Sequence, residues 1–225
     1  MKKQTTRDFP AAAHDRLDAL IVASSANNQV YSDYAFAHNS ILWRFRGVAD
    51  SDDDFRKAYQ LPTEGDCTEK TYLQERALFE FFAAFVSCIE VLCYCSYTIG
   101  TLSDPTTFPL ATEDDRRNVT PKLTIKKFRR QHPTERIVGV LDAVVIGYGD
   151  ADKMRNVLSH RGSPGRNVTV PLGSPQLSST TWKAPSMSQP YLVDESLTKT
   201  NRKWLAQRLD AVLDALCEFA QRVLP

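Results

Sequence analysis

The sequence lacks the motifs by which many enzyme classes are recognised. It contains no G-x-S-x-G, no Walker-type glycine loop, no dinucleotide fingerprint and no H-E-x-x-H. Its histidines are few and do not indicate a metal cluster; they are His14, His38, His132 and His160. These absences give no reason to expect a metal ion or a cofactor, so any chemistry must come from ordinary side chains.

The chain also lacks a strong net charge and a disulfide pattern. Its formal net charge is +1, which gives no global field for nucleic acid, so such binding must come from local patches. The cysteines are odd in number and form no C-x-x-C pair; they are Cys67, Cys88, Cys93, Cys95 and Cys217. Three of them lie in an apolar helical run. We interpret them as reduced core residues of a cytosolic protein.

No secretory signal is visible, because the charged N-terminus is followed by polar residues rather than an apolar core. Residues 77–99 form a run long enough to span a bilayer. That run carries Glu80 and Glu90, and a carboxylate in the middle of a lipid layer is costly. We therefore expect a buried bundle helix in a cytoplasmic protein that has no membrane partner.

The apolar residues that are present recur every three or four positions, as on one face of an α-helix. They predict long helices near residues 11–46, 68–100, 134–160 and 196–223. We expect the first stretch to be one helix or two collinear ones, ending at Gly47. A length of 225 residues suits one domain. The predicted fold class is all-α, a single domain over 1–225 with about four long helices plus short ones.

Three acidic residues after Gly47 occupy every second position, as the first ligands of a calcium-binding loop do. Asp50, Asp52 and Asp54 match the first positions of a calcium loop, but Phe55 replaces the required glycine and Leu61 replaces the bidentate glutamate. We reject calcium binding here. The alternative is a capped short helix that runs through residue 59.

Residues 162–193 hold five prolines and many serines and threonines. We interpret them as an irregular insertion in the helical domain, because loops of this length are usually functional or disordered. The triplets Val168-Thr169-Val170 and Thr180-Thr181-Trp182 have β-forming composition and could pair as a small ribbon.

The stretch 150–166 carries the most suggestive chemistry. It predicts a helix with an acidic start, an apolar stripe and a glycine stop at Gly162. Arg155 lies within it, and His160 lies in its last turn, where free carbonyls and the helix dipole favour a cation. Arg161 and Arg166 follow. A proton carrier beside fixed positive charge suits a phosphodiester.

The spacing between an arginine and a histidine is weak evidence by itself. Arg7 and His14, for example, are also an arginine and a histidine, with six residues between them. Pro10 interrupts that stretch at an N-terminal edge that we expect to fray. The 155–160 match has an apolar helix leading in, a polar residue after the arginine and a glycine behind; the competing reading is a helix whose last cations merely cap carbonyls.

The motif formed by Arg155, Asn156 and His160 resembles that of the HEPN superfamily, in which four to six residues separate an arginine from a histidine and a polar residue directly follows the arginine. Members of this superfamily are all-helical bundles, and many are metal-independent RNases of toxin–antitoxin, abortive-infection and CRISPR systems. The resemblance covers the motif and the helices around it, and it does not extend past Gly162. It implies a metal-independent endoribonuclease that acts as a toxin or an antiphage defence effector.

The chemistry implied is attack of the ribose 2′-OH on the adjacent phosphate, leaving a 2′,3′-cyclic phosphate. His160 can serve as base or acid, and Arg155 can bind the phosphate bidentately. One protomer supplies a single such histidine, so a two-fold homodimer would provide base and acid. The resemblance implies such a dimer, with RNA as substrate and an antitoxin or regulatory protein as a possible partner.

Geometry limits this interpretation. On an ideal helix, residues five apart are separated by about 140°, so Arg155 and His160 do not share a face. Asn156 and His160, four apart, do share one. The arginine and the histidine can converge only if the helix ends near Ser159 or if the arginine side chain curls round.

Some members of the superfamily add an acidic side chain from a preceding helix to the Arg/His pair. Glu90 is the candidate to face Arg155, and Glu80 is the less favoured alternative. Both lie in an apolar helix, where a buried charge needs a partner. The competing interpretation is that both pair with surface arginines.

Residues 116–136 are strongly basic and form the candidate RNA-binding stretch, because spaced cations neutralise backbone phosphates. Its proposed contacts, together with Arg161 and Arg166, are Lys126, Lys127, Arg129 and Arg130. The competing reading is a solvated charged face. Two other functions stay open for the whole chain: a non-catalytic helical module that binds a nucleotide, RNA or protein, and an interaction protein that docks a partner through 162–193.

Overall fold

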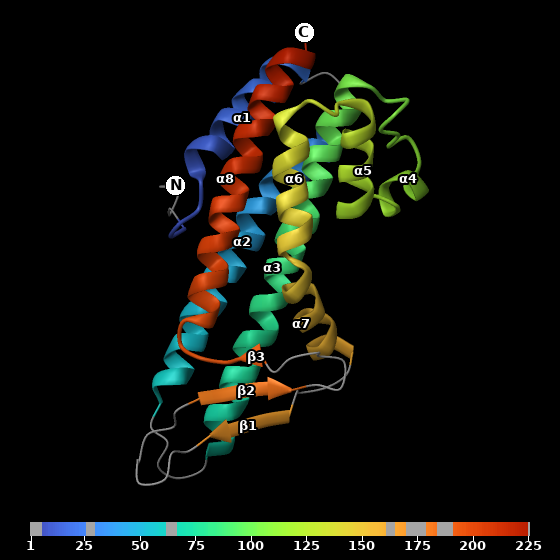
Figure 1. Ribbon diagram of the computed structural model, residues 1–225. Helices are drawn as coiled ribbons and strands as arrows, with labels where there is room; N and C mark the ends of the chain where they lie inside the picture. Colours follow the sequence, from blue (N-terminus) through green and yellow to red (C-terminus); the bar gives the residue numbers. More distant parts are fainter. Residues whose placement is uncertain are drawn as a thin grey trace.

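The computed structural model describes residues 6–25, 30–61, 67–160, 165–169, 179–183 and 191–224. Figure 1 presents a bundle of long helices with a small sheet at one end. The helices are α1 Ala11–Ser25, α2 Tyr31–Gln60, α3 Cys67–Ser103, α4 Glu113–Arg117, α5 Pro121–Gln131, α6 Arg136–Gly147, α7 Gly149–His160 and α8 Leu197–Val223. The predicted all-α bundle is confirmed.

The first two helices are antiparallel neighbours, not collinear segments (Figure 1). The rings of His14 on α1 and His38 on α2 stack 3.6 Å apart, although 24 residues separate them. Collinear helices would hold them about 36 Å apart at 1.5 Å per residue. The collinear prediction is therefore wrong.

Helix α2 does not end at Gly47, and residues 50–59 form no separate short helix. The helix continues to Gln60. A Cβ at Gly47 would lie 3.3 Å from the Cβ of Ala84 on α3, so the glycine allows these two helices to approach closely. A mid-helix glycine costs only about 1 kcal/mol, which packing against α3 readily offsets.

Helix α3 is the central helix, in contact with α2, α5, α7 and α8. Phe81, Phe82, Phe85 and Ile89 are fully buried on it. Within the described residues, α3 alone is long and apolar enough to cross a membrane, over Glu69–Ser103, and 56% of its most apolar stretch is buried in the protein. Four free cysteines are buried in the core, at Cys88, Cys93, Cys95 and Cys217.

The predicted helix 134–160 is broken near its middle. Helix α6 ends at Gly147 and α7 begins at Gly149, and the chain changes direction between them (Figure 1). A Cβ at Gly147 would lie 2.4 Å from Cζ2 of Trp204 on α8. This residue must therefore be glycine for α6 to pack against α8, and the break sets the direction of α7.

Part of the 162–193 excursion forms a three-stranded antiparallel sheet, in the order β1 Gly165–Thr169, β2 Ser179–Lys183 and β3 Tyr191–Leu192. Val168 faces Thr180 across the first pair of strands, which confirms the predicted ribbon over the residues described; Val170 lies outside them. The third strand was not predicted. Trp182 on β2 is fully buried and joins the sheet to the helical core.

Candidate functional site

Helix α7 presents Arg155 toward α3. Met154 and Val157 are buried on the inner face of α7, with Leu158 packed beside them. This apolar stripe, predicted from the sequence, fixes the rotation of the helix. The acids of the first turn form pairs along the helix: Asp150 pairs with Lys153, and Asp152 pairs with Arg155. Acids at this end also suit the helix dipole.

The guanidinium of Arg155 lies between two carboxylates. Its Nη2 donates to Oδ1 of Asp152 at 2.7 Å and lies 3.7 Å from Oε1 of Glu90 on α3. The Arg155 side chain is 31% exposed, and its buried Nε has no hydrogen-bond partner in the described part of the chain. The guanidinium is therefore held in place by two acids, and its exposed part can contact an anionic ligand.

Glu90 is the acid that faces Arg155, as the sequence interpretation favoured over Glu80. Its side chain is 49% exposed, so it is not the buried charge that the apolar helix suggested. Burial nevertheless raises the pKa of Glu90, with Asp152 adding to the rise and Arg155 opposing it. A carboxyl group with a raised pKa is better matched to proton transfer near neutral pH. Glu80 instead pairs with Arg76 on the surface.

His160 is the last residue of α7, so the helix does not end at Ser159 and the backbone keeps Arg155 and His160 on different faces. Arg155 and His160 can therefore converge on one ligand only if the long arginine side chain curls round the helix. Asn156 is half-buried one turn before His160. The side chain of His160, Arg161 and the side chain of Arg166 lie outside the described residues.

Arg7 and His14, which also match the arginine–histidine spacing, lie in a different environment. His14 is buried rather than frayed. Its Nε2 lies 3.0 Å from the carbonyl oxygen of His38, and Nε2 of His38 lies 3.0 Å from the carbonyl oxygen of His14. His38 is thus a hydrogen-bonded core histidine, and the expected fraying near His14 is wrong because α1 packs against α2.

The basic stretch is largely helix α5, and its cations fall into two groups. Lys127 donates to the carbonyl oxygen of Thr107, and Arg129 pairs with Asp142 on α6. Lys126 and Arg130 are exposed, and neither has a partner within the described residues. With Lys122, also exposed, they recur every four positions and so form one stripe, about 12 Å long.

A pocket of about 470 Å³ lies between the Arg155 site and the start of α5. It is lined by Asp33, Phe36, Ala37, Glu90, Val91, Tyr94, Arg116, Val119, Thr120 and Pro121. Arg116 pairs with Asp33 at 3.3 Å, and the hydroxyl of Tyr94 donates to Asp33 at 3.4 Å. Phe36 is 75% exposed. Exposed aromatic rings beside a cation are typical of sites for single-stranded nucleic acid.

The sequence analysis missed this pocket. Arg116 opens the basic stretch and was noted only for its charge, whereas Asp33 and Phe36 lie about 80 positions earlier. The one signal available was Phe36, an aromatic residue outside the apolar stripe of its helix. Such a residue is exposed on a folded helix and indicates a contact surface.

Among the residues that the structure describes, no group of three His, Cys, Asp or Glu side chains could hold a metal ion. Comparisons with protein families, with curated proteins and with solved structures found no match to this chain. The fold and the site therefore define an all-α helical bundle with an arginine–carboxylate surface site, and function must be argued from that site.

Proposed function

We propose that this protein is a metal-independent endoribonuclease with a HEPN-like site. The observation that carries the proposal is the fixed position of Arg155 between Glu90 and Asp152, on the helix that also bears Asn156 and His160. A cation held at a partly exposed surface, beside a carboxyl group whose pKa is raised, suits a reaction that builds charge on phosphate.

In the proposed reaction a base removes the proton of the ribose 2′-OH, and the 2′-oxygen forms a bond to phosphorus. The bond from phosphorus to the 5′-oxygen breaks, and an acid gives that oxygen its proton. Arg155 stabilises the charged phosphorane. His160 carries one proton, and Asn156, one turn away, orients it or binds the ribose. Glu90 holds Arg155 in place and is a second proton carrier.

The surroundings support a single-stranded substrate. The pocket beside Glu90 offers Phe36 and Tyr94 for stacking with a base and Arg116 for a phosphate. The exposed stripe of Lys122, Lys126 and Arg130 continues from the same end of α5 and can bind the backbone. Lys127 and Arg129, which are held by other groups of the protein, contribute less to RNA binding than the sequence suggested.

We further propose that the protein acts in the cytoplasm as a homodimer whose α7 helices lie near the two-fold axis. The dimer would bring a second His160 beside the first, so that one histidine acts as base and the other as acid. A toxin or antiphage effector controlled by an antitoxin or another regulatory protein is the biological role that this chemistry fits.

The test compares two substitutions on the same helix. Arg155→Ala removes the phosphate-binding cation, whereas Lys153→Ala removes an exposed cation that pairs with Asp150. With a labelled single-stranded RNA, Arg155→Ala and His160→Ala are expected to lose 10²–10⁴-fold in cleavage rate, roughly the range for lost acid–base or electrostatic catalysis. Lys153→Ala should cleave like the wild type.

Equal rates for Arg155→Ala and the wild type would refute the proposal. A wild type that binds RNA without cleaving it would favour the second candidate, a non-catalytic helical RNA-binding module. That alternative has support of its own in the exposed Phe36 and in the basic stripe on α5.

A further inference from the structure

A second pocket lies at the start of α8, built from residues that the Arg155 site does not use. It has a volume of about 300 Å³ and is lined by Arg7, Arg56, Glu195, Ser196, Lys199 and Arg202. Four of these six side chains are cations and one is an acid. They come from the segment before α1, from α2, and from the first turns of α8 with the residues before it. Arg56 pairs with Asp53 and Asp52, and Arg202 pairs with Asp8 and Asp52. The cations left for an anionic ligand are therefore Arg7 and Lys199.

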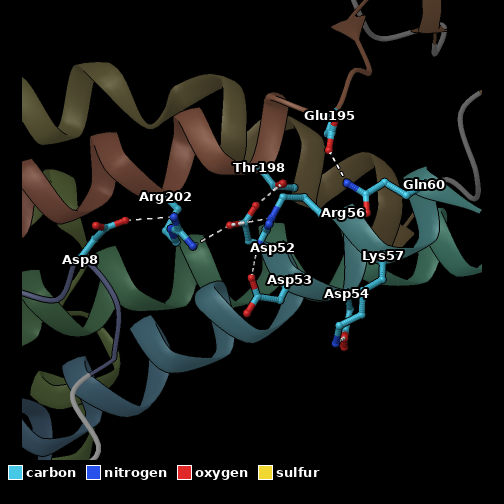
Figure 2. Close-up of polar contacts among 10 residues, drawn as sticks. All are labelled: Asp8, Asp52, Asp53, Asp54, Arg56, Lys57, Gln60, Glu195, Thr198 and Arg202. Carbon is cyan, nitrogen blue, oxygen red and sulfur yellow. Dashed lines mark hydrogen bonds and ion pairs between the residues drawn. The ribbon is translucent and has the colours of Figure 1, made fainter.

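The innermost cation of this pocket is fixed by a buried network (Figure 2). Arg202 is 1% exposed and Asp52, on α2, is 0% exposed; Arg202 Nη1 lies 2.7 Å from Asp52 Oδ2. The hydroxyl of Thr198 donates to the other Asp52 oxygen at 2.6 Å. Arg202 Nη2 also pairs with Asp8 at 3.0 Å. The network holds the guanidinium rigidly at the base of the pocket.

The network leaves cationic donors unused. Arg7 and Lys199 are exposed, and neither has an ion-pair or hydrogen-bond partner in the ranges that the structure describes. The Nε groups of Arg56 and Arg202 are buried and likewise have no hydrogen-bond acceptor there. Two exposed cations thus lie in one pocket with two guanidinium groups that acids hold in place, and phosphate sites commonly use such clustered cations.

The backbone adds to this positive potential. Helix α8 is 27 residues long, and Ser196 does not cap it; the Ser196 hydroxyl donates to Asp194 instead. The Leu197 N–H bonds the carbonyl oxygen of Asp194. The N–H group of Lys199, a residue that lines the pocket, has no acceptor among the described residues. Free N–H groups at a helix N-terminus favour an anion, here beside the pocket cations.

Glu195 gives the pocket a different kind of binding group. Its carboxylate accepts a hydrogen bond from Gln60 Nε2 at 2.8 Å (Figure 2), so it remains an acceptor at the pocket edge. An acid beside a phosphate site suits the hydroxyl groups of a ligand, because a carboxylate can accept from hydroxyls while cations bind the phosphate.

We propose that this pocket binds a phosphate monoester carried on a small polyhydroxylated molecule, such as a sugar phosphate or a nucleoside monophosphate. The side chains of Arg7 and Lys199 and the backbone N–H of Lys199 bind the phosphate, the acid-paired guanidinium groups of Arg56 and Arg202 form the adjoining wall, and Glu195 accepts from a ligand hydroxyl. The proposal does not depend on the ribonuclease activity, since the two sites share no residue.

The test is thermal unfolding of the full-length protein with adenosine 5′-monophosphate, ribose 5-phosphate, inorganic phosphate or adenosine, all at matched ionic strength. Both monoesters are expected to raise Tm, by about 3 °C at ten times Kd for a chain of this size. Inorganic phosphate should raise it less, because it lacks the hydroxyls, and adenosine should not raise it.

Matched variants separate the pocket from general ion effects. Arg7→Ala and Lys199→Ala remove exposed cations without partners, so they should fold normally yet bind the monoesters at least tenfold more weakly in calorimetry. Lys203→Ala, one turn further along α8 in a neighbouring surface pocket, should bind like the wild type. Equal binding by Lys199→Ala and Lys203→Ala, or no response of the wild type to any phosphate, would overturn the proposal.

Discussion

The substitution Asp52→Asn tests whether the buried ion pair between α2 and α8 supports the fold. It replaces one carboxylate oxygen by an amide nitrogen and leaves side-chain volume almost unchanged, so no cavity forms. The substitution removes the negative charge of the fully buried acid that pairs with Arg202. Among the described residues Arg202 then keeps the pair with Asp8, whose side chain is 33% exposed.

Breaking one partner of a buried pair leaves an uncompensated charge in the interior, which costs about 3–5 kcal/mol. We expect Asp52→Asn to lower the free energy of unfolding by about that amount. In a chain of this size 1 kcal/mol corresponds to roughly 2–4 °C, so Tm should fall by about 6–20 °C.

The assay is urea unfolding followed by circular dichroism, with Asp54→Asn as the matched control. Asp54 is two positions away on the same helix, is about half exposed and pairs with Lys57 at 2.9 Å. An exposed pair contributes little, so the control should change stability by about 0.5 kcal/mol or less. If Asp52→Asn also stays within 1 kcal/mol of the wild type, the argument from burial is wrong.

Three further predictions follow from other contacts. Burial, together with the neighbouring His14, lowers the pKa of His38 from 6.5 to about 4. The folded state thus favours neutral His38, and stability should be full above pH 6.5 and fall by about 1.4 kcal/mol per pH unit below it; urea unfolding at pH 7.5, 6 and 5 measures this, and equal values would contradict it. Gly147→Ala places a Cβ against Trp204 and should cost about 1–3 kcal/mol in urea unfolding, whereas Gly149→Ala meets no atom within 4 Å and should be near neutral. Charge reversal of Lys126 and Arg130 should weaken RNA binding and reduce its salt dependence by more than reversal of Arg129, which is paired with Asp142; equal effects of the two changes would show that the exposed stripe is not the RNA contact.

The long helices could be predicted because each one buries a stripe of apolar residues, and that periodicity is visible in the sequence. The reversal between α1 and α2 could not, because no glycine or proline separates the two stripes. Gly47 suggested a helix end, but close packing of α2 on α3 at Ala84 keeps the helix continuous. Local sequence signals therefore predicted which residues are helical better than they predicted where each helix begins and ends.

The buried ion pair had a signal that the sequence analysis did not use. Asp52 falls on the apolar stripe of α2 between Val48 and Phe55, and Arg202 falls on that of α8, three positions before Leu205. Opposite charges on two buried stripes predict a pair. The calcium-like spacing of the neighbouring aspartates drew attention to metal binding instead.

The candidate site could be predicted only in part. Arg155 and Glu90 were proposed from the motif and lie 3.7 Å apart. Lys127 and Arg129 could not be distinguished from their neighbours, because the groups that hold them, Thr107 and Asp142, are set by tertiary packing. Pairing between remote segments is the information that a local charge pattern lacks.

The most direct test of the central claim is end-group analysis of a single-stranded RNA incubated with the purified wild-type protein, with and without EDTA. The account predicts 5′-hydroxyl and 2′,3′-cyclic phosphate ends, formed at the same rate in both conditions. No cleavage, products ending in 5′-phosphate, or loss of cleavage in EDTA would contradict it.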